Sequence, residues 1–386
     1  AGGPAPGLRR VPAVPMSRSR VALAAGVLAA GLARGGRAAP PLAPFLNVYQ
    51  GVNTNPDVSP EDFGSRTRSV LQPDPLTARG ARRDEYVLIQ PGVRLPLLDR
   101  PGLSAGARYQ AEWERYDSVR PGDQANHSVS AGLNWMPAGM ILAANAAYSY
   151  RVFPGVLGSD GKPVLNHHVA GLGFSAELPV AFGGALRLVG GASGQALRYP
   201  RYRVVDSAGR PGDRTARQDT VAYGSGGVAL GRAETAGVRV TLEAGRTGSN
   251  GLVEQAGAWR NYFAHDASGV RASLWWATPW LPLRLEASGL TERRSSLERL
   301  VLASGAREHA AILTLAGSVT WKLARGLGLT AEVQSFRYAT NEPGRAYRDV
   351  RGLAGLRVAD LLFAPAPAAP ARRAGPRVDP DPLRDT

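Results

Sequence analysis

The sequence predicts an all-β fold: a closed antiparallel transmembrane β-barrel of about fourteen strands, with short periplasmic turns and long extracellular loops. Two patterns carry this prediction. Short segments alternate apolar and polar residues, and the links between these segments alternate between short and long along the chain. A third observation supports it, because aromatic residues gather near the ends of the expected strands rather than at their middles.

The alternation is clearest between Gly102 and Tyr116. Successive side chains of a strand point to opposite faces, so one face there is apolar and the other polar. A soluble β-sandwich shows the same alternation, so this pattern by itself leaves both folds open. The apolar face carries Leu103, Ala105, Ala107, Tyr109, Ala111 and Trp113, and the polar face carries Ser104, Gly106, Arg108, Gln110, Glu112 and Glu114.

The links distinguish the two folds. A sandwich has no reason to sort its loops by length, whereas outer-membrane barrels have short turns on one side and long loops on the other. The short links are Asp99–Pro101, Pro137–Gly139, Pro179–Gly184, Arg232–Thr235, Pro279–Pro282 and Ala324–Gly326. The long polar links are Asp117–Ala125, Phe153–Leu165, Pro200–Arg217, Thr247–Ala258, Arg293–Arg307 and Ala339–Tyr347.

These links delimit six hairpins, and one strand on each side of them completes an even number with both ends of the barrel in the periplasm. The expected strands are Pro44–Val52, Tyr86–Leu98, Leu103–Tyr116, His127–Met136, Met140–Arg151, His167–Leu178, Ala185–Tyr199, Thr220–Gly231, Ala236–Arg246, Tyr262–Ala277, Leu283–Thr291, His309–Leu323, Leu327–Tyr338 and Arg348–Phe363.

The segments outside the strands have their own composition. We interpret residues 1–15 as an upstream extension and residues 16–38 as a signal peptide, because Arg18 and Arg20 precede a short apolar run and small residues follow it. A buried helix is the alternative. The barrel is expected over residues 39–363, with Asn53–Glu85 as either a plug or a surface loop. Residues 364–386 are rich in Pro, Ala and Arg and are expected to be disordered.

Composition excludes several classes of protein. The 386 residues contain no cysteine, so thiol chemistry and disulfides are ruled out, and no apolar run is long enough for a transmembrane helix. The net charge is +15, but the arginines are dispersed, so we do not expect nucleic-acid binding. An exported chain of this kind is expected in the outer membrane, with the surrounding lipid and the barrel-assembly machinery as partners, and with a possible periplasmic partner for the tail.

Charged residues sort to one face of the expected strands. A charge facing lipid near the bilayer midplane costs about 2–4 kcal/mol, so this face must be the interior. The interior residues either pair and fill the barrel or line a polar channel, and the sequence leaves both possibilities open. The predicted interior residues are Arg108, Glu112, Glu114, Glu177, Arg239, Glu243, Arg271, Arg284, Glu286, Glu332, Gln334 and Arg357.

Aromatic residues near both ends of the strands predict two girdles at the membrane–water interfaces. One group lies next to short turns and the other near long loops. The predicted girdle residues are Trp113, Trp135, Tyr148, Trp276, Trp280, Trp321 and Tyr338.

No motif indicates an enzyme, a cofactor site or a metal site. Ser104 lies in a Gly-x-Ser-x-Gly pattern, but a turn precedes it and a strand follows it, whereas a nucleophile elbow lies between a strand and a helix. The adjacent His167 and His168 point to opposite faces of a strand and cannot share one ion. A serine–histidine pair across two strands stays open as the basis of a lipid-modifying hydrolase.

Two segments resemble known outer-membrane barrels. The last predicted strand, with Tyr347-Arg348 before it and Phe363 at its end, resembles the final strand that the assembly machinery reads in such families. Residues 47–55 (NVYQGVNTN) are similar to the first strand and loop of fourteen-stranded barrels of the surface lipoprotein assembly modifier type. That resemblance implies an outer-membrane barrel. The family carries a helical repeat domain before its barrel, a pattern we do not find in the residues before residue 47.

Three functions fit these observations. The first is a barrel that passes polar solutes or assists the export of a secreted substrate. The second is a non-conducting assembly or anchoring barrel that binds a partner through its loops or tail. The third is the lipid-modifying hydrolase.

Overall fold

The computed structural model describes residues 42–54, 83–118, 123–154, 166–205, 211–232, 234–301, 303–324, 326–342 and 346–359. The expected extension, signal peptide and tail lie outside these residues, as does most of Asn53–Glu85 and the end of the last predicted strand at Phe363. Among the residues described, no helix is long and apolar enough to cross a bilayer.

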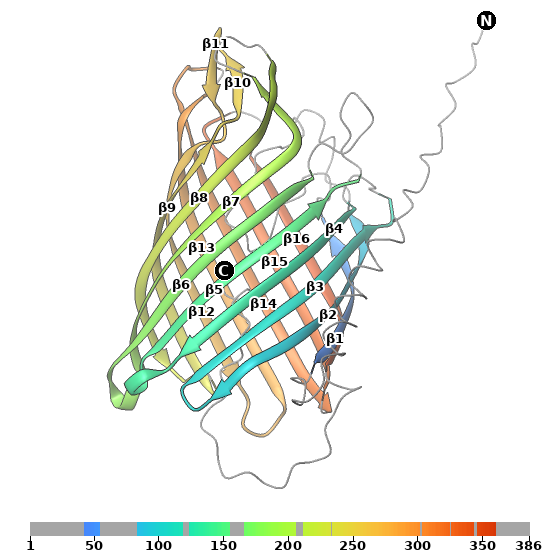
Figure 1. Cartoon of the computed structure of the whole chain (residues 1–386), viewed down its shortest axis with the longest axis vertical. Helices are drawn as coiled ribbons and strands as arrows, with labels where there is room; N and C mark the ends of the chain where they lie inside the picture. The colour runs from blue at the N-terminus through green and yellow to red at the C-terminus, as the bar shows by residue number, and fades with distance from the viewer. Residues whose placement is uncertain are drawn as a thin grey trace, which may run out of the picture. The chain divides into compact units, whose positions relative to one another are not determined.

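Fourteen antiparallel strands form a closed barrel, and consecutive strands of the barrel are neighbours throughout (Figure 1). The ring closes where β1 pairs with β16, from Phe45 opposite Ala359 to Asn53 opposite Arg351. The barrel strands are β1 (Ala43–Asn53), β2 (Asp84–Arg100), β3 (Leu103–Tyr116), β4 (Gln124–Trp135), β5 (Ile141–Val152), β6 (His167–Ala181), β7 (Leu186–Val205), β8 (Pro211–Gly231), β9 (Ala236–Ser249), β12 (His265–Ala277), β13 (Leu283–Leu300), β14 (Arg307–Ala324), β15 (Leu327–Thr340) and β16 (Tyr347–Ala359).

The predicted fold class is confirmed, and its physical cause is visible in the register. Large apolar side chains that are exposed on neighbouring strands lie opposite one another, as Leu188 does with Val228 and Val228 with Val240. The intervening positions carry the polar residues and point inward. A closed ring leaves no free strand edge, so every strand can satisfy its backbone groups inside a bilayer.

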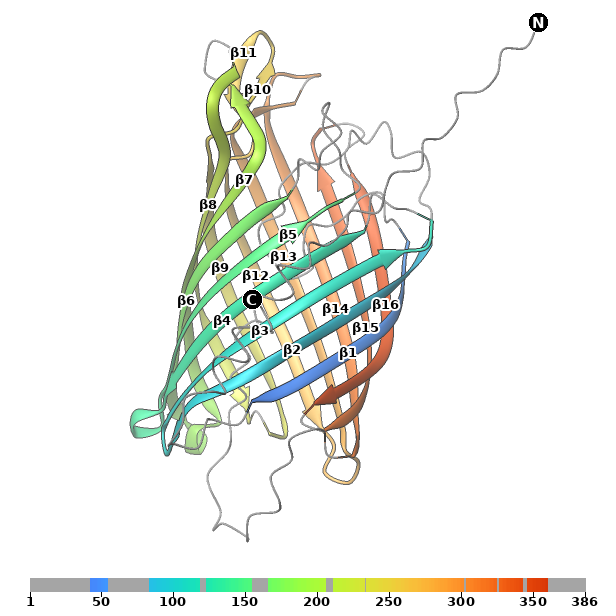
Figure 2. The same ribbon diagram turned by 45° about the vertical axis from the view of Figure 1, so that its right-hand side comes forward.

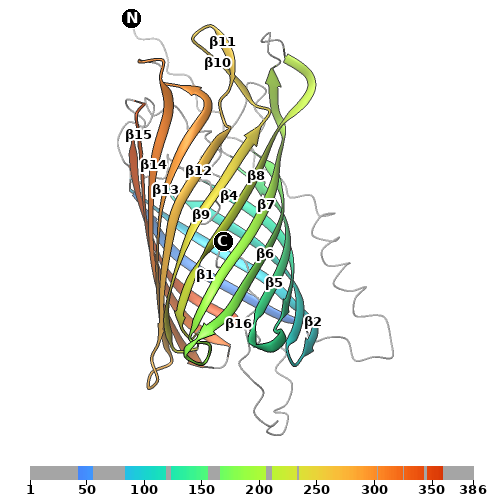
Figure 3. The same ribbon diagram turned by 90° about the vertical axis from the view of Figure 1, so that its left-hand side faces the viewer.

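The short turns gather at one end of the barrel and the longer connections at the other (Figures 2 and 3). Two short turns contain a single 3-10 turn each, at Pro137–Gly139 and Phe182–Gly184. Gly231 closes another with φ +110°, and a Cβ there would lie 2.2 Å from the carbonyl oxygen of Ala236. A residue larger than glycine would therefore collide with the backbone of this turn.

On the loop side, three segments that we expected to be links are partly strand. β7 and β8 continue through much of Pro200–Arg217, and β13 continues to Leu300 inside Arg293–Arg307. Between β9 and β12, a separate hairpin of β10 (Leu252–Gln255) and β11 (Ala258–Asn261) rises above the barrel (Figure 3). Strands outside the bilayer need no apolar face, so the alternation that predicts strands ends before the ladder does.

Candidate functional site

The barrel interior is the candidate site, and the register places all twelve predicted interior residues on the inward face. Arg271, for example, pairs with Thr241, while its neighbour Val270 pairs with the exposed Leu242 on the opposite face. The other predicted interior residues follow the same parity on their strands: Arg108, Glu112, Glu114, Glu177, Arg239, Glu243, Arg284, Glu286, Glu332, Gln334 and Arg357.

In the half of the barrel near the short turns, interior charges are paired and still reach solvent. Glu177 on β6 binds Arg187 of β7 at 2.8 Å and also Arg239 of β9. Arg284 binds Glu286 at 2.5 Å. The side chains of Arg239, Arg284 and Glu286 are 31%, 40% and 37% exposed. Because these groups point inward, water reaches the interior at this level.

In the half near the long loops, three groups of interior side chains are buried. The first of three groups, which we call the Arg217 cluster, consists of Tyr199, Tyr202, Arg217, Asp219 and Phe263. The guanidinium of Arg217 binds Asp219 at 2.5 Å and lies 3.6 Å from the centre of the Phe263 ring. It also lies 4.5 Å and 5.4 Å from the ring centres of Tyr199 and Tyr202. The side chains of Arg217 and Asp219 are 1% and 5% exposed, so this ion pair is shielded from water.

The second group, the Arg351 cluster, joins both sides of the β1–β16 closure. Arg351 on β16 reaches Glu114 on β3 and donates a hydrogen bond of 3.1 Å to the Tyr116 hydroxyl. Its guanidinium lies 4.8 Å from the centre of the Tyr86 ring, and Asn53 donates to Tyr116 at 2.9 Å. Tyr86 and Tyr116 are buried against each other, with ring centres 5.3 Å apart. This contact crosses β1 and β2 through the interior.

The third group, the Glu308 cluster, lies at the loop-side ends of β13 to β15. Glu308 accepts hydrogen bonds from the hydroxyls of Tyr338 at 3.2 Å and Thr340 at 3.0 Å, and it binds Arg299. Tyr338 packs with Phe336 and Ile312 below this network. Together the three clusters place buried aromatic and charged groups along the inner wall of the barrel on the loop side.

Tyr338 corrects one prediction. We expected it in the outer aromatic girdle, but it points inward and is buried. Its neighbour Arg337 pairs with the exposed Leu313 on the outward face, so Tyr338 points to the opposite, inward face. Nearness to a loop end indicates the height of a side chain but leaves its face undetermined, and the Glu308 carboxylate offers the Tyr338 hydroxyl a buried partner. Parity counted along the same strand from Gln334, a predicted interior residue, would have given the inward assignment.

The other predicted girdle residues point outward or lie in a turn. Trp135, Trp276 and Trp321 are exposed beside short turns, and Trp280 is exposed within one. At the loop side, Tyr148 is exposed and contacts His168, and Trp113 lies edge-on to His127. Amphipathic rings at these heights match the two membrane–water interfaces.

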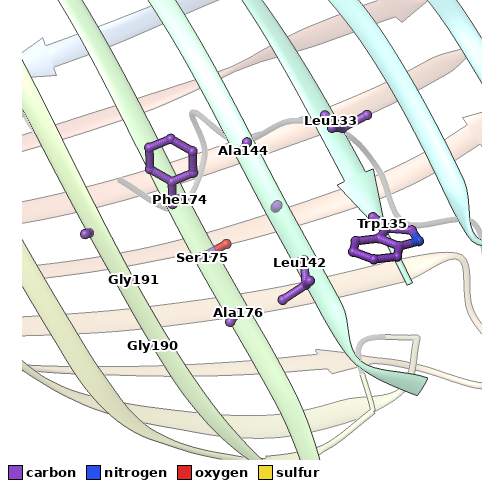
Figure 4. Close-up of a pocket in the computed structure, with 11 residues that line it drawn as sticks. Leu133, Trp135, Leu142, Ala144, Phe174, Ser175, Ala176, Gly190 and Gly191 are labelled. Atoms are coloured by element: carbon purple, nitrogen blue, oxygen red, sulfur yellow. The ribbon is translucent and has the colours of Figure 1, made fainter. Parts of the chain in front are cut away.

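The outward face also carries a shallow apolar groove of about 440 Å³ between β4 and β7 (Figure 4). Trp135 and Phe174 stand beside a floor of small residues that includes Ala144 and Ala176. Such a surface is compatible with lipid chains and offers no polar chemistry. No group of metal-binding side chains occurs among the residues described.

Comparisons with known proteins found similarity to solved structures alone. No family model matches, and no curated protein matches. Similar solved structures include a loop L8 deletion mutant of OmpT, an outer membrane protein of Vibrio cholerae, at 12% identity and a TM-score of 0.37, covering 83% of this chain and 100% of that chain. They also include the outer membrane channel DcaP of Acinetobacter baumannii, at 10% identity and a TM-score of 0.41, covering 83% and 96%.

A third similar structure is CdiB from Acinetobacter baumannii, at 7% identity and a TM-score of 0.42, covering 82% of this chain and 60% of that one. The location follows from the barrel itself, because an outward apolar band, a polar interior and loops sorted by length suit a bilayer crossed by strands. The protein is an outer-membrane β-barrel of fourteen strands, located in the Gram-negative outer membrane.

Proposed function

We propose that the barrel passes polar solutes, or part of a secreted substrate, between the periplasm and the cell surface, without catalysis. The observation that supports this most is the exposure of inward charges in the turn half, where Arg239, Arg284 and Glu286 keep 31–40% of their side chains accessible. Both signs of charge are present there, so the wall suits polar solutes without strongly favouring anions or cations.

The loop half then acts as the constriction. The three buried clusters place aromatic rings and ion pairs along the interior at the extracellular end, so passage is controlled there rather than at the periplasmic mouth. Each cluster uses residues from more than one strand, which fixes its side chains against the wall. A solute would therefore enter freely from the periplasm and meet its main barrier near the loops.

Removing buried rings from this constriction should increase ion flow. In a planar bilayer, we expect Tyr86→Ala with Tyr116→Ala to raise the single-channel conductance several-fold above that of the wild type, because two buried rings leave the interior of the Arg351 cluster. Tyr148→Ala is the matched control, since it removes the same ring from the outward face and should leave conductance unchanged. Wild-type and double-variant proteins that both stay closed at every voltage would overturn the channel proposal.

A non-conducting anchoring barrel is the second candidate, and the β10–β11 hairpin favours it. Gln255 fastens this hairpin to the end of β13, donating to the Leu300 carbonyl at 3.2 Å and accepting from its amide at 3.0 Å. A raised hairpin held by a rigid contact is a surface that a partner could bind. Pull-down with the hairpin or the tail of residues 364–386 deleted would locate such a partner. The assembly machinery stays a proposed partner during biogenesis.

A lipid-modifying hydrolase is the third candidate, and one contact favours it. Ser295 on β13 and His309 on β14 face each other on the outward surface, with the Ser295 Oγ 3.0 Å from the His309 Nδ1. A serine activated by a histidine at a lipid boundary is the minimum needed for acyl transfer. Asn341 does not orient this imidazole, because its side chain bonds the backbone amide of His309 and the carbonyl of Arg307.

Ser295→Ala tests this third candidate. If the pair is catalytic, release of fatty acid from phospholipid in mixed micelles should fall by about 100-fold or more, since the substitution removes the nucleophile itself. Ser268→Ala, a serine on the same outward face of β12, serves as the control. We expect no hydrolysis by the wild type, which the channel proposal requires, and measurable turnover that depends on Ser295 would reverse the order of the candidates.

A further inference from the structure

Two sectors of the outward surface at the loop-side border of the membrane differ in their side chains. On β4 to β6 this surface is aromatic, where the Tyr148 hydroxyl lies 2.6 Å from His168 Nδ1 and Tyr150 stacks on the same imidazole. On β13 to β16 it is basic, with Arg293, Arg337 and Arg348 all exposed. This basic sector is not explained by the interior function, because its side chains point away from the lumen.

The register defines the geometry of the basic sector. Arg337 on β15 lies directly opposite Arg348 on β16. Arg293 on β13 pairs with Ala311 on β14, which in turn pairs with Ala339 on β15. Ala311 and Ala339 thus lie between Arg293 and the other arginines, and their small side chains project little from this surface. We call this surface the arginine patch.

The charges of the patch favour an anion. Like charges directly opposite each other on a sheet destabilise it, and Arg337 faces Arg348 in this way. The outward acid on β12, Asp266, is already bound in a two-bond contact by Arg246 of β9. Among the residues described, Arg293 and Arg337 have no ion pair with an acid. A bound anion would give the guanidinium groups of Arg293 and Arg337 a counter-charge.

The height of the patch identifies the source of that anion. Below Arg337, β14 carries the exposed apolar residues Leu313, Leu315, Val319 and Trp321 on the same face. From Trp321 to Leu313 the strand covers roughly 20 Å of bilayer depth, taking a rise of about 3.4 Å per residue and a tilt of about 40°. Arg337 lies opposite Leu313, at the top of this apolar band, where the headgroups of the outer leaflet begin.

We propose that Arg293, Arg337 and Arg348 form a binding surface for the phosphate groups of lipid headgroups in the outer leaflet. The guanidinium group presents a planar fork of donors that matches phosphate oxygens in a bidentate contact. Binding here would hold a shell of lipid against β13 to β16 and fix the depth of that sector in the membrane. The proposal does not depend on whether the lumen conducts.

The test uses the full-length protein in detergent micelles, titrated with bisphosphorylated lipid A and followed by native mass spectrometry. We expect Arg293→Gln with Arg337→Gln to weaken binding on the order of 10-fold to 30-fold, since each arginine near an anionic lipid surface contributes about 1 kcal/mol. Arg115→Gln with Arg198→Gln is the matched control, because these exposed outward arginines lie on β3 and β7, away from the patch.

Two further arms separate the sources of phosphate. Dephosphorylated lipid A should bind the wild type no better than it binds the double variant, and inorganic phosphate at millimolar concentration should not displace the lipid. Equal binding of lipid A by the patch variant and the wild type would overturn the proposal. So would equal loss in the control variant, equal binding of the dephosphorylated lipid, or full displacement by inorganic phosphate. Unchanged heat-modifiable gel mobility will show that each variant has folded.

Discussion

Asp219→Ala is expected to destabilise the barrel by about 3–5 kcal/mol, because it leaves the charge of Arg217 buried without its counter-ion. Arg217 is 1% exposed and is enclosed by the rings of Phe263, Tyr199 and Tyr202, so neither water nor a rotamer change can readily replace the carboxylate. Asp219 also accepts a hydrogen bond of 2.5 Å from Ser249, which joins β8 to β9. The measurement is reversible urea unfolding in micelles, followed by tryptophan fluorescence.

Asp266→Ala is the matched control for this prediction. Asp266 binds Arg246 through the same two-bond geometry, but the two side chains are 45% and 66% exposed. Solvent screens this pair, so its loss should destabilise the barrel far less than the loss of Asp219. Equal losses for the two variants would show that burial of the Arg217 cluster does not determine its energetic role.

Val333→Glu should destabilise the folded barrel by up to about 2 kcal/mol, whereas Gln334→Glu should cost far less, because it places a carboxylate opposite Arg351. The two residues are adjacent near the middle of β15, but Val333 points outward and is 54% exposed, while Gln334 points inward opposite Arg351. An outward charge must lose its hydration in lipid, and an inward one meets the polar interior. Unfolding from lipid vesicles, rather than from detergent, is the appropriate measurement.

The comparison of Val333 with Gln334 tests which face of β15 contacts lipid. Both variants introduce the same side chain at nearly the same height, so differences in strand propensity and synthesis largely cancel. The two costs would be equal if the barrel did not sit in lipid with this face outward. A larger cost for Gln334→Glu would show that the middle of the lumen is too tightly filled to accept another charge.

The predicted strands show where sequence patterns carry structural information. On β9, the alternation of Arg239 and Glu243 with Val238, Val240 and Leu242 fixed the inward face, because lipid on one side and polar groups on the other penalise any shift by one residue. Beyond the bilayer this selection ends. The extensions of β7, β8 and β13 and the β10–β11 hairpin therefore left no periodic signal, and we expected loops there.

The sequence by itself determined the class of fold, the near-complete set of strands and the face on which charges such as Arg284 and Glu286 lie, since all of these follow from a two-residue repeat against a bilayer. Only the tertiary structure decided which inward groups meet. Arg351 and Glu114 come from opposite sides of the ring closure, and Arg239 reaches Glu177 across two intervening strands. Those contacts depend on the curvature of the closed barrel and on the stagger of its strands, neither of which a local pattern of residues records.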